Sequence, residues 1–244
     1  MADVMQHDVM DHQAWMAVAD EEYRRLLAML DQFCEQDWHR PTACTEWNVA
    51  QLVAHLIGAA EAGASLREMA RQAWTARKQR LGAPRVDAMN DVQVHERSGL
   101  SPERLCADLG DAAERAVRRR RGVPPWVRAI PVPFGPPLGV RPIGYLMDCI
   151  YTRDAWMHRV DLAQATGHPL VLTVEHDGRL VADVVREWSD HHVQPYCLIL
   201  TGVAGGRWTR GAGGEQIVLD AVEFCQAVSG RVPRHGLLAV PVPF

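Results

Sequence analysis

Apolar residues recur every three or four positions through much of the first two thirds of the chain, which is the spacing of an amphipathic helix. Helix-starting residues precede two of these stretches. Asn48 with Gln51 three positions later forms a capping-box pattern, and Ser101 is followed by a proline in the first turn. Gly167 is a natural end for the last stretch. The pattern therefore predicts four long helices, over residues 9–34, 48–74, 101–121 and 143–166.

Proline and glycine dominate residues 122–142, between the third and fourth predicted helices. Proline lacks the backbone N–H that helices and sheets need, so this density predicts a loop without regular structure. A loop of this length inside a compact domain often forms the wall or lid of a pocket.

The pattern changes after Gly167. Short apolar runs bounded by glycine and proline alternate with two shorter helical stretches, which is typical of a small α+β domain. We therefore predict an α+β protein with a four-helix bundle over residues 1–167 and a small domain over residues 168–244. The expected strands are 170–174, 196–201, 207–209 and 216–219, and the expected helices are 180–188 and 220–229.

Composition narrows the possible classes of function. The 244 residues carry a formal net charge of -4, which does not indicate nucleic-acid binding, since that function usually shows as a clustered basic surface. Its one basic run, Arg118–Arg121, ends a predicted helix, where cations favour the helix dipole; phosphate binding is the minor alternative. The six cysteines form no C-x-x-C pair, and neither a signal peptide nor a membrane-spanning apolar run is evident. We expect a cytoplasmic protein without disulfides, as a monomer or homodimer.

A carboxylate four residues before a histidine recurs five times along the chain, and this spacing places both side chains on one helix face. Only Asp154–His158 lies between apolar turns, and His55 on the second predicted helix has the same apolar setting. Two imidazoles and one carboxylate match the ligand set of a catalytic divalent metal with an open position. Core histidines with hydrogen-bond partners are the simpler alternative. The other pairs are Asp8–His12, Glu35–His39, Asp91–His95 and Glu187–His191.

Three further residues are candidates for supporting roles. Asp161 lies one turn beyond His158; a metal ligand is one alternative, but an orienting hydrogen-bond acceptor or an ion-pair partner is favoured. Arg231, which follows the last predicted helix, can hold a substrate carboxylate through its planar guanidinium, with a solvated surface residue as the alternative. Cys44 can act as a nucleophile, but a structural role is favoured because no base is near it in the sequence.

Three segments together resemble the mycothiol-dependent maleylpyruvate isomerase family. The first is Thr42-Ala43-Cys44-Thr45-Glu46-Trp47-Asn48-Val49 leading to His55-Leu56. The second is Arg153-Asp154 with Trp156, His158-Arg159, Asp161, Ala163 and Gly167. The third comprises residues 219–225, Ser229-Gly230-Arg231 and Gly236-Leu237-Leu238.

The resemblance implies a DinB-like four-helix bundle with a zinc site, followed by a small sterol-carrier-protein-like domain. It implies His55, Asp154 and His158 as metal ligands and Arg231 as the catalytic arginine. Better-studied members have glutamate at the position of Asp154, whose side chain is one methylene shorter. The implied cofactors are a divalent metal, Zn²⁺, and mycothiol.

The activity implied by the resemblance is isomerisation or S-transfer on a small electrophile, expected to carry a carboxylate. Metal coordination would lower the pKa of the thiol, and the thiolate would add to an electrophilic carbon. Expulsion of the thiol after bond rotation gives an isomerase, and retention of the adduct gives an S-transferase. Two other hypotheses remain at this point: a metal-free or structural-metal binding protein for an apolar small molecule, and a metal-dependent hydrolase.

Overall fold

The computed structural model describes residues 9–44, 46–79, 85–135 and 139–244. The chain divides into two compact units. One is His12–Pro169, and the other is Leu170–Phe244 together with residues 9–11. Asp8, of the Asp8–His12 pair, lies outside the described residues. The described helices include none that is both long and apolar enough to cross a membrane.

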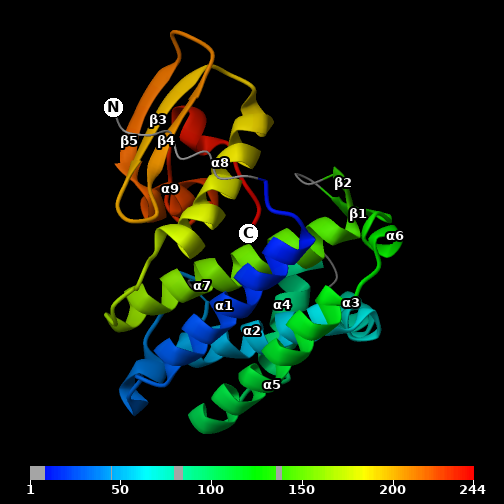
Figure 1. Ribbon diagram of the computed structural model, residues 1–244. Helices are drawn as coiled ribbons and strands as arrows, with labels where there is room; N and C mark the ends of the chain where they lie inside the picture. The colour runs from blue at the N-terminus through cyan, green and yellow to red at the C-terminus, as the bar shows by residue number, and fades with distance from the viewer. Residues whose placement is uncertain (1–8, 45, 80–84, 136–138) are drawn as a thin grey trace. The chain divides into compact units, whose positions relative to one another are not determined.

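Four long helices form the core of the first unit (Figure 1). Helix α5 packs against α1 and α2, and α7 packs against the same two helices, so the four enclose one apolar core. The predicted cap of α2 is present, since Asn48 Oδ1 accepts from the Gln51 backbone N–H and Gln51 Oε1 accepts from that of Asn48, both at 2.9 Å. The helices are α1 (His12–Leu30), α2 (Val49–Ala64), α5 (Pro102–Arg121) and α7 (Tyr151–Thr166).

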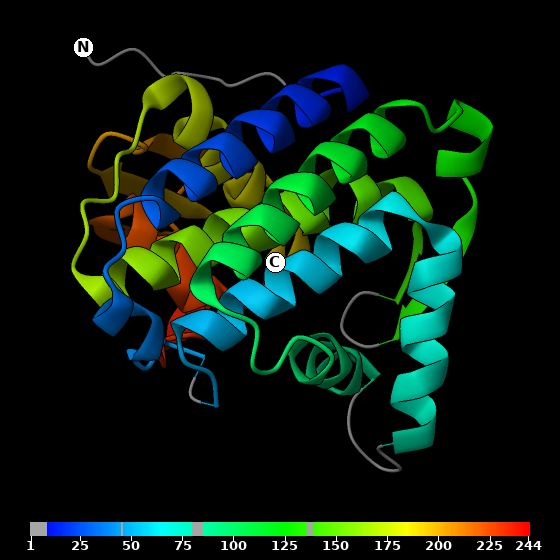
Figure 2. The ribbon, with the colours of Figure 1, turned by 90° about the horizontal axis from the view of Figure 1, so that it is seen from below.

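The prediction of one helix from residue 48 toward residue 74 is wrong. Ser65 adopts an extended backbone (φ -150°) that ends α2, and its Oγ accepts from the backbone N–H of Glu68 in the next helix, α3 (Leu66–Gln79). Figure 2 shows the sharp change of direction between α2 and α3. A further helix, α4 (Arg85–His95), has no amphipathic stripe, and it packs against α2 and α3.

The prediction of a loop without regular structure over residues 122–142 is also wrong. A short helix, α6 (Pro125–Arg128), precedes an antiparallel hairpin of β1 (Pro131–Gly135) and β2 (Gly139–Pro142). A two-stranded ribbon tolerates prolines because each strand has one edge without a partner, where no backbone N–H is required. A π-helical turn, Tyr145–Ile150, then leads into α7.

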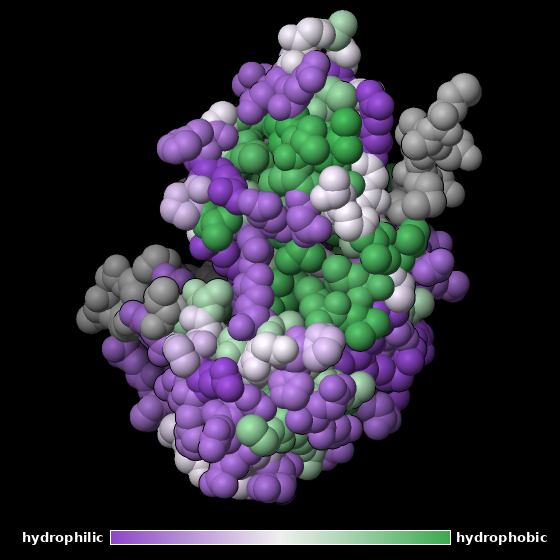
Figure 3. Space-filling view, turned by 90° about the vertical axis from the view of Figure 1, so that its left-hand side faces the viewer, coloured by the Kyte–Doolittle hydropathy of each residue, from purple (hydrophilic) through white to green (hydrophobic). Residues whose placement is uncertain are grey.

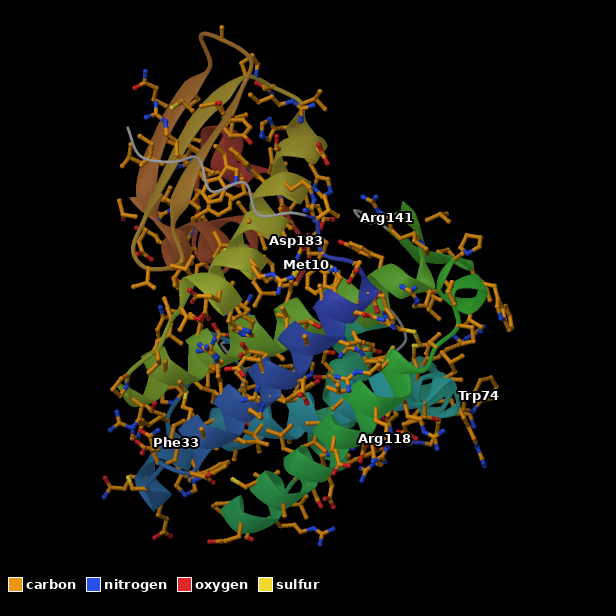
Figure 4. The ribbon with its side chains drawn as sticks, viewed as in Figure 1. Met10, Phe33, Trp74, Arg118, Arg141 and Asp183 are labelled. Carbon is orange, nitrogen blue, oxygen red and sulfur yellow. The ribbon has the colours of Figure 1, made fainter. Side chains whose placement is uncertain are left out.

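The arginine run at the end of α5 is only partly a solvated surface. Arg118, labelled in Figure 4, is exposed and pairs with Glu114. Arg120 is buried, and it donates to Thr152 Oγ1 of α7 at 2.8 Å. One arginine of the run therefore points its side chain into the bundle, and the other three are exposed. In Figure 3 the lower end of this unit is largely hydrophilic on the face drawn, as expected for helices whose apolar sides point inward.

The second unit is a small α+β domain, so the predicted α+β class is confirmed. Strand β3 pairs antiparallel with β4 and parallel with β5, and Trp188 of α8 packs edge-on against Tyr196 and Phe224 in the core. The predicted strand over residues 170–174 is wrong, because Thr173 instead caps a π-helical turn, Val174–Gly178. The other elements are α8 (Arg179–His192), β3 (Tyr196–Thr201), β4 (Gly206–Arg210), β5 (Glu215–Asp220), α9 (Ala221–Val228) and a 3₁₀ turn, Gly236–Ala239.

Candidate metal centre

The bundle brings the three predicted ligands together. His55 lies in the middle of α2, and Asp154 and His158 lie one turn apart on α7. Asp154 Oδ2 is 3.4 Å from His55 Nε2, and Asp154 Oδ1 is 3.3 Å from His158 Nε2. One ligand atom from each residue falls within 4.8 Å of the other two. Metal binding itself stays a prediction.

Both N–O separations are compatible with ligands of one metal ion. Charge-assisted N–H···O hydrogen bonds are about 2.7–2.9 Å long, shorter than either N–O distance here. A tetrahedral zinc ion holds N and O ligands at about 2.0–2.1 Å, which places neighbouring ligand atoms roughly 3.3–3.4 Å apart. Two nitrogens and one carboxylate also make the donor set of catalytic zinc sites, with the fourth position open.

Each histidine uses its other ring nitrogen for a hydrogen bond. His158 Nδ1 lies 3.0 Å from Asp161 Oδ2, and His55 Nδ1 lies 2.8 Å from Gln93 Oε1. Both partners are buried, and when each offers an oxygen to Nδ1, Nε2 is the ring atom that faces Asp154. Acceptors of this kind orient the histidine ligands of metal sites. Asp161 Oδ2 therefore lies within hydrogen-bond distance of His158, and its orienting role stays a prediction.

The electrostatics of the cluster favour the charged forms of its members. Burial alone would raise the pKa of Asp154, but the two histidines outweigh it and hold that pKa far below its usual range. Burial would likewise lower the pKa of His158, yet the Asp154 charge and the hydrogen bonds of Asp154 and Asp161 raise it well above its usual value. The metal-free protein therefore favours the charged forms of Asp154 and His158 as an ion pair.

The neighbours of the cluster come from the segment before α2. The indole of Trp47 lies against the His55 ring, with centroids 5.0 Å apart and planes tilted by 31°. The Cys44 thiol lies 3.9 Å from Asp161 Oδ2 and forms a second group of ligand atoms with Asp161 and His158. Cys44 therefore has acid–base neighbours that its sequence context does not reveal.

Gln93 is a site residue that sequence reasoning missed. It lies on α4, in a stretch without an amphipathic stripe, and no spacing pattern connects it to His55. The Gln72 side chain of α3 continues this contact, since its Oε1 accepts from Gln93 Nε2 at 2.8 Å. Only the packing of α3 and α4 against α2 reveals either residue.

Arg231 belongs to the other unit. It follows α9, is half-buried, and donates its backbone N–H to the Gln226 carbonyl at 3.0 Å. Its catalytic role stays a prediction. Among the remaining carboxylate–histidine pairs, Glu187 and His191 lie 3.5 Å apart on α8.

Comparison with known proteins defines the class to which this bundle and its site belong. Residues 19–163 match the family model described as the mycothiol maleylpyruvate isomerase N-terminal domain, which is more than half of the chain. The chain therefore belongs to the mycothiol maleylpyruvate isomerase family, and the resemblance drawn from its motifs is confirmed.

Two solved structures resemble the fold. The crystal structure of the mycothiol-dependent maleylpyruvate isomerase shares 17% sequence identity, with a TM-score of 0.59, over 91% of this chain and 90% of that chain. A crystal structure of a mutant of that isomerase matches over the same shares, with 16% identity and a TM-score of 0.58. No curated protein sequence matches significantly. At these identities the likeness shows the fold alone.

Proposed function

We propose that this protein is a mycothiol-dependent enzyme, an isomerase or S-transferase, that acts on a small electrophile bearing a carboxylate at a divalent-metal site. The observation that carries this proposal is the arrangement of the two histidines. Both Nε2 atoms face the Asp154 carboxylate, while both Nδ1 atoms are committed to buried acceptors. Family membership supports the choice of mycothiol, which the names of the family and of both similar structures include.

In this proposal His55, Asp154 and His158 hold the metal, and zinc fits their donor set. When bound, the divalent cation would lower the pKa of a coordinated thiol, so that thiolate is present at neutral pH. Asp161 and Gln93 hold the two imidazole rings in orientation.

Asp154 replaces the glutamate implied by the family resemblance. Its shorter side chain still reaches both histidines, because it lies one turn before His158 on the same helix and faces His55 across the α2–α7 contact. An aspartate at this position is therefore compatible with a metal centre.

Arg231 is assigned to the substrate. Its guanidinium would bind a substrate carboxylate through two parallel hydrogen bonds or stabilise a developing oxyanion. Because lysine keeps the charge but lacks the planar fork, Arg231→Lys should raise KM or lower kcat for a carboxylate substrate while leaving the metal content unchanged. Arg234→Lys, in the same segment, is the matched control, and an equal loss there would remove the assignment.

The first experiment measures metal in protein purified without added zinc. Near-stoichiometric metal is expected in the wild type, with strong loss in His55→Ala and His158→Ala. His168→Ala is the matched control, since His168 is also paired with an aspartate of this unit, Asp37, at 3.1 Å. A wild type without metal, or ligand variants that keep it, would contradict the proposal.

A second experiment separates thiol chemistry from water chemistry. The wild type and His158→Ala are incubated with mycothiol and a panel of electrophiles that carry carboxylates, and the products are identified by mass spectrometry and by isomer-resolving chromatography. We expect thiol-dependent isomers or S-adducts from the wild type alone. Products that form without thiol and contain added water would instead identify a hydrolase.

A further inference from the structure

Two buried glutamines connect His55 to the backbone of its own helix. His55 Nδ1 lies 2.8 Å from Gln93 Oε1, and Gln93 Nε2 donates to Gln72 Oε1 at 2.8 Å. Gln72 Nε2 then donates to the Gly58 carbonyl at 3.0 Å and to Glu68 Oε1 at 3.1 Å. Gln72 is 0% and Gln93 3% exposed, so in this row the protein itself supplies the hydrogen-bond partners of both amides.

The direction of this row is set at its far end. The Gly58 carbonyl can only accept, and a hydrogen bond from Arg71 lowers the pKa of Glu68, so that its carboxylate also accepts. Gln72 must therefore turn its NH₂ group toward these two acceptors and its oxygen toward Gln93. Gln93 in turn points its NH₂ group at Gln72 and its oxygen at His55.

The opposite direction would be incompatible with metal binding. A reversed Gln93 would present N–H groups to His55 Nδ1, and the ring proton would move to Nε2, the atom that faces Asp154. It would also place the oxygens of Gln93 and Gln72 against each other. The row thus favours the one tautomer of His55 that can bind a metal.

Gly58 is required for the close approach of α4. A Cβ atom at this position would lie 2.4 Å from Cγ and 2.5 Å from Cβ of Gln93, far inside van der Waals contact. The clash is with the stem of Gln93 and not with its mobile end. Any larger residue at this position would therefore displace the amide from His55.

We propose that Gln93 and Gln72 are positioning residues of the metal centre, which keep the proton of His55 on Nδ1 and leave Nε2 free to bind the metal. This inference rests on the proposed function, because it requires that His55 is a metal ligand. Gly58 contributes twice, through its carbonyl and through its missing side chain.

The test compares two variants of Gln93. Leucine has a similar volume but no acceptor, whereas glutamate keeps an acceptor oxygen for His55 Nδ1. Zinc affinity is measured by competition with a chromophoric chelator, and thermal melting of the metal-free proteins checks that each variant is folded. We expect affinity to fall by about 10–100-fold in Gln93→Leu and by clearly less in Gln93→Glu. If Gln93 served only for packing, the apolar Gln93→Leu would be the milder change, and that order would overturn the proposal.

Two further measurements make the result specific. Gly58→Ala keeps every polar group but displaces Gln93, so it should also weaken zinc binding, whereas Gln226→Leu changes a buried glutamine of the other unit and should not. In ¹⁵N NMR of the zinc-loaded protein, the Nδ1–H proton of His55 should exchange slowly in the wild type and lose this protection in Gln93→Leu.

The outcomes separate this inference from the proposed function. A wild type that binds zinc, with equal affinity in Gln93→Leu, would overturn the positioning role and leave the metal enzyme intact. A wild type that binds no zinc would overturn both.

Discussion

Replacement of Asp161 by asparagine should weaken metal binding moderately, by an amount that follows from the strength of its hydrogen bond to His158. Asp161 is 0% exposed, and its Oδ2 accepts the Nδ1 proton of His158 at 3.0 Å. A hydrogen bond to a charged group contributes about 1.5–3 kcal/mol, and one between neutral groups about 0.5–1.5 kcal/mol. Asparagine keeps an acceptor oxygen but loses the charge, so roughly 1–1.5 kcal/mol should be lost. Since about 1.4 kcal/mol corresponds to a tenfold change, zinc affinity should fall roughly 5- to 12-fold.

Chelator competition measures this change, and Asp161→Ala extends the series. Alanine removes the acceptor and frees the His158 ring to rotate, so a loss of about 10–100-fold is expected. Asp37→Asn is the matched control, because it neutralises another buried aspartate that pairs with a histidine of the same unit. Wild-type affinity in Asp161→Asn would refute the reasoning, and so would an equal loss in the asparagine and alanine variants.

Three other outcomes are expected. The pKa of His158 is raised and that of Asp154 is lowered. Their ion pair should therefore stabilise the metal-free protein most between about pH 4 and 6.5, and this stabilisation should decrease as pH rises through the His158 pKa. Zinc affinity should instead fall as pH decreases, because protons compete with zinc for His158. Melting curves with and without zinc across this pH range test both the stability and the affinity prediction. Asn48→Ala removes the cap of the helix that carries His55 and should cost about 1 kcal/mol in chemical denaturation, against no loss in a variant at an exposed position such as Gln79→Ala. Trp188→Ala empties the aromatic core of the small domain and should cost about 3–5 kcal/mol, and a loss below about 1 kcal/mol would contradict the packing described.

Local sequence patterns predicted much of the helical structure of the bundle. Helical periodicity and the Asn48 cap were sufficient to predict the helices that carry the site, because both depend on residues three or four positions apart. The apolar setting of His55 and of Asp154–His158 distinguished them from similar pairs elsewhere. The same local patterns did not predict the β1–β2 hairpin or the end of α2 at Ser65. The hairpin depends on pairing between two strands, and the break depends on the backbone direction at one residue, and composition encodes neither.

The sequence by itself therefore determined the family, the helices of the bundle and the three proposed metal ligands. Only the tertiary structure decided how those ligands are held. Gln93 is 38 positions from His55, and Gln72 is 14 positions from Gly58, so no helical or strand period relates them. Their hydrogen bonds exist because α3 and α4 pack on α2, and because Gly58 leaves room for Gln93. Side-chain spacing within a helix is a local property, whereas the partner of each imidazole is set by which helices meet.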